Sequence, residues 1–106
     1  MANGILGTSE VPATTDTTVY TVPADTFSVV TLNVVNRSSA PRLVRVAMSA
    51  SATPTAAEYI EYDVEILANG VLERTGLVLD ATKNIVVYAD SLGCSAVAFG
   101  LETATA

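Results

Sequence analysis

Apolar and polar side chains alternate with a period of two along residues 59–66. The apolar positions are Ile60, Tyr62, Val64 and Ile66, with acidic residues between them. This alternation is typical of a β-strand with one buried and one solvated face. A second apolar segment, residues 71–80, follows after four intervening residues. The pattern therefore predicts two consecutive strands at the centre of the fold.

The link between these strands contains Asn69-Gly70, a pair that tolerates the positive φ angles of a two-residue hairpin turn. Such a turn places Glu65 opposite Arg74, an ion pair that contributes up to ~1 kcal/mol across two strands. We therefore predict a hairpin in which Asn69, Gly70, Glu65 and Arg74 are the structural residues. The alternative is that residues 67–70 turn a corner between two sheets, because pattern and turn together set the register.

Five further segments have the β-branched or alternating character of strands. They are residues 17–22, 27–36, 43–49, 84–89 and 94–103, and we expect a hairpin between the second and the third. The composition predicts a loop over residues 49–55 and one helical turn over residues 54–58. About seven or eight short, regularly spaced strands predict an all-β fold, an antiparallel β-sandwich. A jelly-roll-like sandwich is our first choice, and an immunoglobulin-like one is the alternative.

The chain has 106 residues, the length of one domain. Residues 1–16, rich in Gly, Ser and Thr, predict an extended N-terminal arm with at most a short strand at Ile5-Leu6. We expect a neighbouring subunit to hold this arm, and residues 17–106 to form a single β-sandwich domain. The inward positions of the alternating runs predict the core: Val30, Leu32, Val34, Val44, Val46, Tyr62, Val64, Leu77, Val87, Val97 and Phe99.

Hydrophobic residues make up 50% of the chain and charged residues only 15%, with a net charge of −6. Five scattered basic residues disfavour nucleic acid as a partner, because phosphate binding needs clustered Lys and Arg. No apolar run approaches the ~18 residues of a membrane-spanning helix, and the N-terminus does not resemble a secretory signal. We therefore expect synthesis and assembly in a host cytoplasm, and burial of surplus apolar surface against protein partners.

The chain contains no histidine and a single cysteine, Cys94, which excludes Ser-His and Cys-His nucleophiles and disfavours a zinc site. Cys94 leads into an apolar strand and is expected to be buried as a small hydrophobic residue. The acidic residues Glu58, Glu61, Asp63 and Glu65 are the candidate metal ligands. Three interpretations are open: a solvated face paired with Arg45, Arg74 or a neighbour, a calcium site, or a pair of catalytic carboxylates. The first is favoured, so we expect no cofactor and no enzymatic activity.

The four tyrosines, Tyr20, Tyr59, Tyr62 and Tyr88, have two interpretations. They could form a platform on which sugar rings stack. The absence of tryptophan and an aromatic content of only 6% favour the other interpretation, tyrosines in the core or at an interface.

Two long strings, TTVYTVPADTFSVVTLNVVNRSS and EYIEYDVEILANGVLERTGLVL, together with a closing SAVAFGLE, resemble small virion structural proteins of tailed bacteriophages. The likeness is greatest to those of phages that infect cyanobacteria, and it covers residues 17–102. The resemblance implies a β-sandwich that decorates the capsid or builds a tail or baseplate. It carries no active-site residues to transfer.

Together these observations predict a non-enzymatic virion protein, most simply a capsid decoration (cement) subunit that stabilises the head. Its expected partners are the major capsid protein and further copies of itself, in a trimer that follows from capsid symmetry. The alternatives are a tail, neck or baseplate component, or a module that binds a glycan or host surface. Edge strands without the usual Lys and Pro also point to association with partners.

Overall fold

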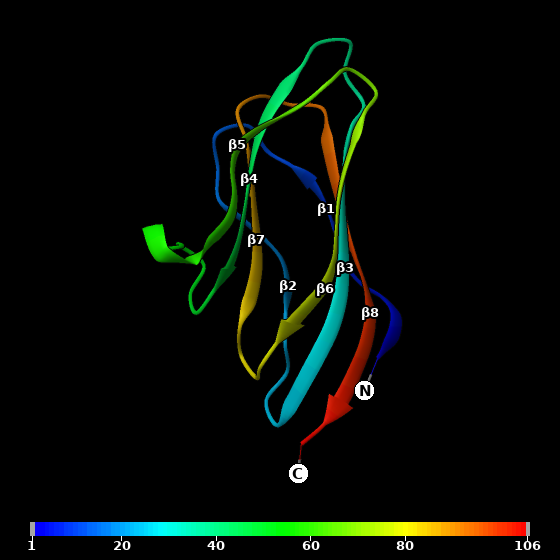
Figure 1. Cartoon of the computed structure of the whole chain (residues 1–106), viewed down its shortest axis with the longest axis vertical. Coiled ribbons are helices and arrows are strands. Elements are labelled where there is room, and N and C mark those ends of the chain that lie inside the picture. Colours follow the sequence, from blue (N-terminus) through cyan, green and yellow to red (C-terminus); the bar gives the residue numbers. More distant parts are fainter. Residues whose placement is uncertain (1, 106) are drawn as a thin grey trace.

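The alternating segments form two packed antiparallel sheets in the computed structural model, which describes residues 2–105 (Figure 1). Within that range there are eight strands and one short 3₁₀ helix, η1. Their bounds are β1 Asn3–Val11, β2 Thr17–Thr21, β3 Thr26–Asn36, β4 Arg42–Ser49, η1 Ala56–Glu58, β5 Tyr59–Ile66, β6 Val71–Leu79, β7 Asn84–Ala89 and β8 Cys94–Ala104. The predicted all-β sandwich and the single helical turn are confirmed.

One sheet has the strand order β1-β8-β3-β6 and the other β2-β7-β4-β5. We call them the terminal sheet and the middle sheet, because the first contains both terminal strands. The chain pairs with itself symmetrically about the loop at residues 50–58: β4 with β5, β3 with β6, β2 with β7 and β1 with β8. This is the strand order of a hairpin rolled into a jelly roll, so the first choice of architecture is confirmed.

The rolled topology corrects both predicted hairpins. Strands β5 and β6 lie in different sheets, and so do β3 and β4. Only β4 and β5 are consecutive in sequence and paired with each other. Residues 67–70 therefore turn the corner between sheets, which was the alternative interpretation.

The corner at residues 67–70 is a tight turn held by a buried side chain. The Gly70 amide donates to the Leu67 carbonyl at 2.8 Å, and Asn69 has a φ of 60°. A positive φ at the third residue is the requirement of a type II turn. The Asn36 amide nitrogen, fully buried, donates to the Ile66 carbonyl at 3.0 Å and to the Ala40 carbonyl at 2.8 Å. Asn36 thus joins two corners at one end of the sandwich.

Residues 3–11 are part of the sandwich and do not form a separate arm. They form the edge strand β1, which pairs with β8 of the same chain from Asn3 to Val11. Gly7 allows this position, because a Cβ atom there would lie 2.1 Å from the Val19 carbonyl oxygen of β2. The expected boundary after residue 16 is therefore not a boundary between arm and domain.

The core lies between the sheets and is built largely from small and β-branched residues. Eight predicted core positions are buried or half-buried: Val30, Leu32, Val34, Val44, Val46, Val64, Leu77 and Val87. Cys94 is also fully buried in the core, as predicted, and burial raises the pKa of its thiol.

Three predicted core residues face outward instead. Tyr62 is 57% exposed, because β5 has a bulge in which Tyr62 and Asp63 together oppose Arg45. The alternation along β8 is regular, but its small residues Ala96 and Ala98 point inward. Val97 and Phe99 therefore lie on the outer surface of the terminal sheet.

Candidate interaction surface

The outer surface of the terminal sheet carries a cluster of large apolar side chains. In the strand register, Leu101 of β8 lies beside Val29 of β3, and Val29 lies beside Val78 of β6. The next row places Ile5 of β1 beside Phe99. We call this cluster the apolar face and define it as Ile5, Val29, Val78, Val97, Phe99 and Leu101.

Much of the apolar face is open to solvent. Ile5 is 71% exposed, Val78 60%, Leu101 58% and Val29 42%. Soluble monomers rarely present contiguous apolar surface of this kind, and where it occurs it usually marks a binding site. The neighbours that complete these rows, Asn3 and Thr31, are uncharged. The next row, which contains Val97, ends at the exposed Glu73 beside Asn33, and the Glu10–Arg37 pair lies further along the sheet.

One polar group lies unpaired beside the apolar face. Asn33 of β3 is opposite Val97 of β8, and its side-chain oxygen is buried without a hydrogen-bond partner in the described structure. A buried acceptor without a donor costs about 1–3 kcal/mol. The outer surface of the terminal sheet therefore exposes large apolar side chains and, within one chain, leaves one hydrogen-bond acceptor without a donor.

The edges of both sheets are irregular. Each of the four edge strands, β1, β2, β5 and β6, has a register shift against its neighbour. On β6 the irregularity lies at Thr75-Gly76, where Gly76 has a φ of 68°. Bulges bend an edge strand and interrupt its row of free amides and carbonyls, which discourages pairing with a strand of another molecule.

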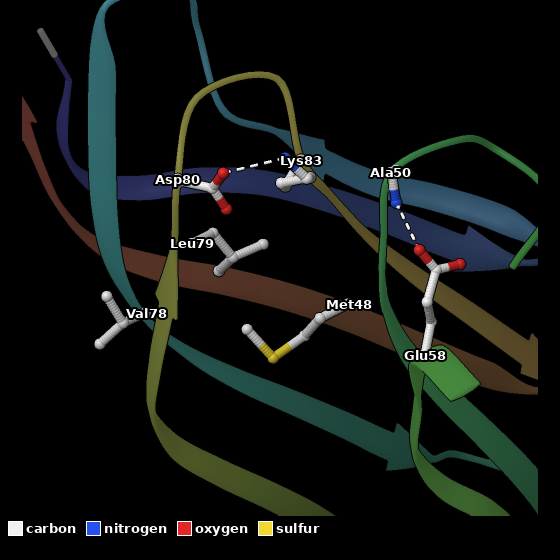
Figure 2. A pocket seen from close by; sticks show the side chains of 7 residues that line it. All are labelled: Met48, Ala50, Glu58, Val78, Leu79, Asp80 and Lys83. Atoms are coloured by element: carbon white, nitrogen blue, oxygen red, sulfur yellow. Dashed lines mark hydrogen bonds and ion pairs between the residues drawn. The ribbon is translucent and has the colours of Figure 1, made fainter. Parts of the chain in front are cut away.

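A hollow of about 120 Å³ opens between the two sheets beside β6 (Figure 2). It exists because β5 pairs with β4 only as far as Ala47, so Met48 and Ala50 have no β5 neighbour. Met48 and the buried Leu79 form its apolar floor, and Val78 links it to the apolar face. We call it the edge hollow; Met48, Ala50, Glu58, Val78, Leu79, Asp80 and Lys83 line it.

The charged residues around the edge hollow all have partners. Lys83 Nζ lies 2.9 Å from Asp80 Oδ2. The Glu58 carboxylate accepts hydrogen bonds from the Ala50 and Thr55 amides at 3.0 and 2.9 Å. Those amide donors lower the pKa of Glu58 to about 2. Glu58 therefore stays ionised at neutral pH and fixes the loop before β5, and the hollow has an apolar floor with charged groups at its rim.

The four candidate metal ligands do not converge. Glu58 holds its own loop, Glu61 pairs with Arg74 at 2.8 Å, and Asp63 pairs with Arg45 at 2.7 Å. Glu65 is exposed and lies opposite Leu43. Among residues 2–105 no three acidic or cysteine side chains are grouped so that they could hold a metal ion. The favoured interpretation was a solvated acidic face paired with Arg45 or Arg74, and both arginines do pair with this face. Arg74, however, pairs with Glu61 and not with Glu65.

Three of the four tyrosines gather on the outer surface of the middle sheet. The Arg45 guanidinium stacks between the rings of Tyr62 and Tyr88, 4.2 and 4.5 Å from their centroids. Tyr59 contacts Tyr62 edge to face at 5.0 Å. The bulge at Tyr62 and Asp63 makes this arrangement, because it turns both side chains towards Arg45.

The fourth tyrosine, Tyr20, is buried in the core. Its hydroxyl donates to the Glu102 carboxylate and lies 2.6 Å from the Ser28 hydroxyl. Burial and the Glu102 carboxylate raise the pKa of Tyr20 to about 12, and the Ala2 amide and Tyr20 lower the pKa of Glu102. This network anchors the start of β1, because the Ala2 amide donates to Glu102 at 2.7 Å.

The fold and this surface define a jelly-roll domain with an exposed apolar face on one sheet. No family model, curated protein or solved structure matches the chain. Within residues 2–105 no helix has the length and apolar character needed to cross a membrane. Sequence analysis missed the apolar face, because it assigned Val97 and Phe99 to the core. The one available signal was that both sides of residues 94–101 are apolar.

Proposed function

We propose that this chain is a non-enzymatic structural subunit of a virion, a capsid decoration subunit of a tailed phage. The observation that carries the proposal is the exposed apolar face, whose rows at Leu101 and Phe99 contain no charged residue. Burial of apolar surface is the main favourable contribution to most protein–protein association. A subunit that contributes such contacts at many equivalent positions stabilises a particle through multivalency and needs no chemistry of its own.

Two further observations agree with this proposal. The sequence strings that resemble phage virion proteins span most of the domain, from β2 to β8. The jelly roll is a recurrent architecture of viral capsid and lectin domains. The same arguments apply to a tail, neck or baseplate subunit, which is the alternative within the same class.

The proposal is tested on virus particles purified from the source of the chain. Mass spectrometry with copy-number determination should find the chain among the abundant proteins of the particle. Heads from which the chain has been removed should bind it again and become more resistant to heat. Detection only at the tail, by labelled electron microscopy, would favour the alternative, and absence from the particles would refute both.

A second candidate function is glycan binding, which the tyrosine cluster on the middle sheet favours. Tyr62 is 57% exposed and adjoins Tyr59 and Arg45. A glycan array probed with the protein and with Tyr62→Ala tests it. Signals that disappear in Tyr62→Ala would support a carbohydrate module, whereas no signal for the unaltered protein would remove it.

A further inference from the structure

We infer that the edge hollow receives a lysine side chain of a partner protein, with the aliphatic stem on its apolar floor and the ammonium group beside Glu58. The inference deepens the proposed function and rests on it in one respect, because the partner is the protein that covers the adjoining apolar face. It specifies one chemical feature of that partner's surface.

The floor and the size of the hollow suit an unbranched aliphatic chain. Met48 and the buried Leu79 form the floor, and Figure 2 shows their side chains pointing towards each other. The hollow has a volume of about 120 Å³. Cavities of about 150 Å³ with an apolar lining take up a benzene molecule, so the hollow can hold the four-carbon stem of a lysine. Lysine commonly buries this stem while its charged head stays at the surface.

The rim of the hollow carries one negative charge that no cation balances. Lys83 Nζ lies 2.9 Å from Asp80 Oδ2, so the charges of these two residues offset each other. Glu58 accepts hydrogen bonds from the Ala50 and Thr55 amides, which lower its pKa to about 2 and keep it ionised at neutral pH. Among residues 2–105 no arginine or lysine pairs with Glu58. The complementary occupant of this rim is therefore a cation.

The hydrogen bonds that Glu58 already makes favour an ammonium group over a guanidinium group. A carboxylate has about four lone-pair sites. Oε1 accepts from the Thr55 amide at 2.9 Å and from the Ser49 hydroxyl at 3.1 Å, and Oε2 accepts from the Ala50 amide at 3.0 Å. One site therefore remains, on Oε2, and Figure 2 shows this oxygen on the side of the carboxylate nearer to Leu79. A lysine ammonium needs one acceptor, whereas the planar fork of arginine suits two.

The charge of the chain indicates that this lysine belongs to a different protein. A net charge of −6 attracts positively charged surfaces at long range and repels identical copies. The sequence contains a single lysine, Lys83, which lines the hollow itself and is paired with Asp80. A second copy therefore has no free lysine to supply.

The position of the hollow connects it to the apolar face. Val78 belongs to both, so a partner that covers the apolar face can also place a side chain in the hollow. Apolar burial supplies most of the binding free energy in such a contact. The lysine fixes the position of the partner along β6, because a displaced partner would leave both its ammonium group and Glu58 unpaired.

An NMR titration of the free protein tests the site with Nα-acetyl-lysine amide as the probe. The matched probe is Nα-acetyl-norleucine amide, which has the same four-carbon stem and no charge. The signals of the Ala50 amide and of the Met48 and Leu79 methyl groups should shift on addition of the lysine probe. The norleucine probe should bind about two- to fivefold more weakly, the effect of one partly exposed ion pair. Nα-acetyl-arginine amide should also bind more weakly than the lysine probe.

Two variants change the charge of the rim in opposite directions. Glu58→Gln removes the negative charge and should weaken binding of the lysine probe, whereas Lys83→Ala frees Asp80 and should strengthen it. Glu73→Gln is the matched control, because Glu73 is exposed on β6 and does not line the hollow. Its affinity for the lysine probe should equal that of the unaltered protein. Circular dichroism checks that each variant is folded, and Lys83→Ala decides the test if Glu58→Gln is not.

Three results would each overturn the inference. They are the absence of shifts at the hollow, equal affinity for the lysine probe and for either of the other probes, and a loss of affinity that Glu73→Gln reproduces. The titration uses the free protein, so its failure is distinct from that of the proposed function, which is measured on virus particles. A chain that stabilises heads and does not bind the lysine probe loses this inference alone. A chain that binds the probe and is absent from the particles keeps the lysine site and loses the proposed function.

Discussion

Arg74 Nη1 lies 2.8 Å from Glu61 Oε2 and joins the edge strands of the two sheets, β6 and β5. Glu61 is the better buried partner, with 18% of its side chain exposed against 41% for Arg74. The pair closes the sandwich along the side where its sheets are connected only by the corner at residues 67–70. The sequence predicted that Arg74 would pair with Glu65 across a hairpin. The two residues lie on strands of different sheets, and Arg74 pairs with Glu61 instead.

Glu61→Gln should therefore destabilise the protein, and Glu65→Gln should not. Partly exposed ion pairs contribute about 0.2–1 kcal/mol, so the expected loss for Glu61→Gln is at most ~1 kcal/mol. Urea unfolding at pH 7 measures both variants, and high salt should reduce the difference between them. Equal losses for the two variants would argue against the cross-sheet pair.

The turn at the corner should be more sensitive at Asn69 than at Gly70. Asn69 has the positive φ and Gly70 does not, although a Cβ on Gly70 would make a tight contact of 3.0 Å with the Leu67 carbonyl oxygen. Asn69→Val forces a β-branched residue into the left-handed region and should cost about 1–3 kcal/mol. Asn69→Gly should leave the stability close to that of the unaltered protein. A larger loss of stability for Gly70→Val than for Asn69→Val would contradict this turn geometry.

The orientation of β8 can be tested by two substitutions on neighbouring residues. Ala98 is fully buried in the core, and Val97 is on the outer surface. Ala98→Leu overpacks the core and should cost about 1–3 kcal/mol. Val97→Thr keeps the β-branched shape and should change the stability by less than ~0.5 kcal/mol, as exposed substitutions usually do. If Val97→Thr were the more damaging variant, the predicted core assignment would be right and the observed one wrong.

How far the sequence predicts the structure depends on the kind of pattern in each strand. In β3, valine and leucine at every second position identified the core residues Val30, Leu32 and Val34 correctly. In β8 both sides are apolar, so the period of two could not decide which side is buried, and Phe99 was assigned inward. In β5 the bulge at Asp63 shifts the register, and no periodic pattern reveals a bulge.

The candidate surface could not be predicted from the sequence for a topological reason. Asn69-Gly70 is compatible with a hairpin and with a corner, and only the pairing order of all strands decides between them. The apolar face joins β1, β8, β3 and β6, which are far apart in sequence. The edge hollow depends on where β5 stops pairing with β4, a boundary with no local signal.

Removal of divalent cations should leave the stability unchanged. Glu58, Glu61 and Asp63 are each held by different protein partners, so their carboxylates do not share a site. Thermal unfolding with EDTA and with added calcium measures this directly. A melting temperature that rises with calcium would show that the acidic residues of β5 bind the ion after all.

Acidification should lower the stability of the protein through Glu58 at pH values at which the protein is still folded. The Ala50 and Thr55 amides lower the pKa of Glu58 from 4.5 to about 2 in the folded state. A depressed pKa means that the unfolded chain binds a proton more readily. The contribution of Glu58 to the free energy of unfolding is therefore complete above about pH 5, and it declines as the pH falls from there towards 2. The pKa of Glu102 is lowered too, so Glu102 acts in the same direction.

Glu58→Gln isolates this effect from the other carboxylates. At pH 7 the variant should be less stable than the unaltered protein, because it loses the charged acceptor of two backbone amides. As the pH falls towards 2 the difference between the two proteins should shrink, since Glu58 is then protonated in the unfolded chain and about half protonated in the folded one. Glu73→Gln, on an exposed position of β6, should follow the unaltered protein at every pH. Urea unfolding at steps between pH 7 and pH 2 measures the free energy of unfolding of each protein. If Glu58→Gln and the unaltered protein differed by the same amount at every pH, the depressed pKa of Glu58 would be ruled out as the cause of the difference.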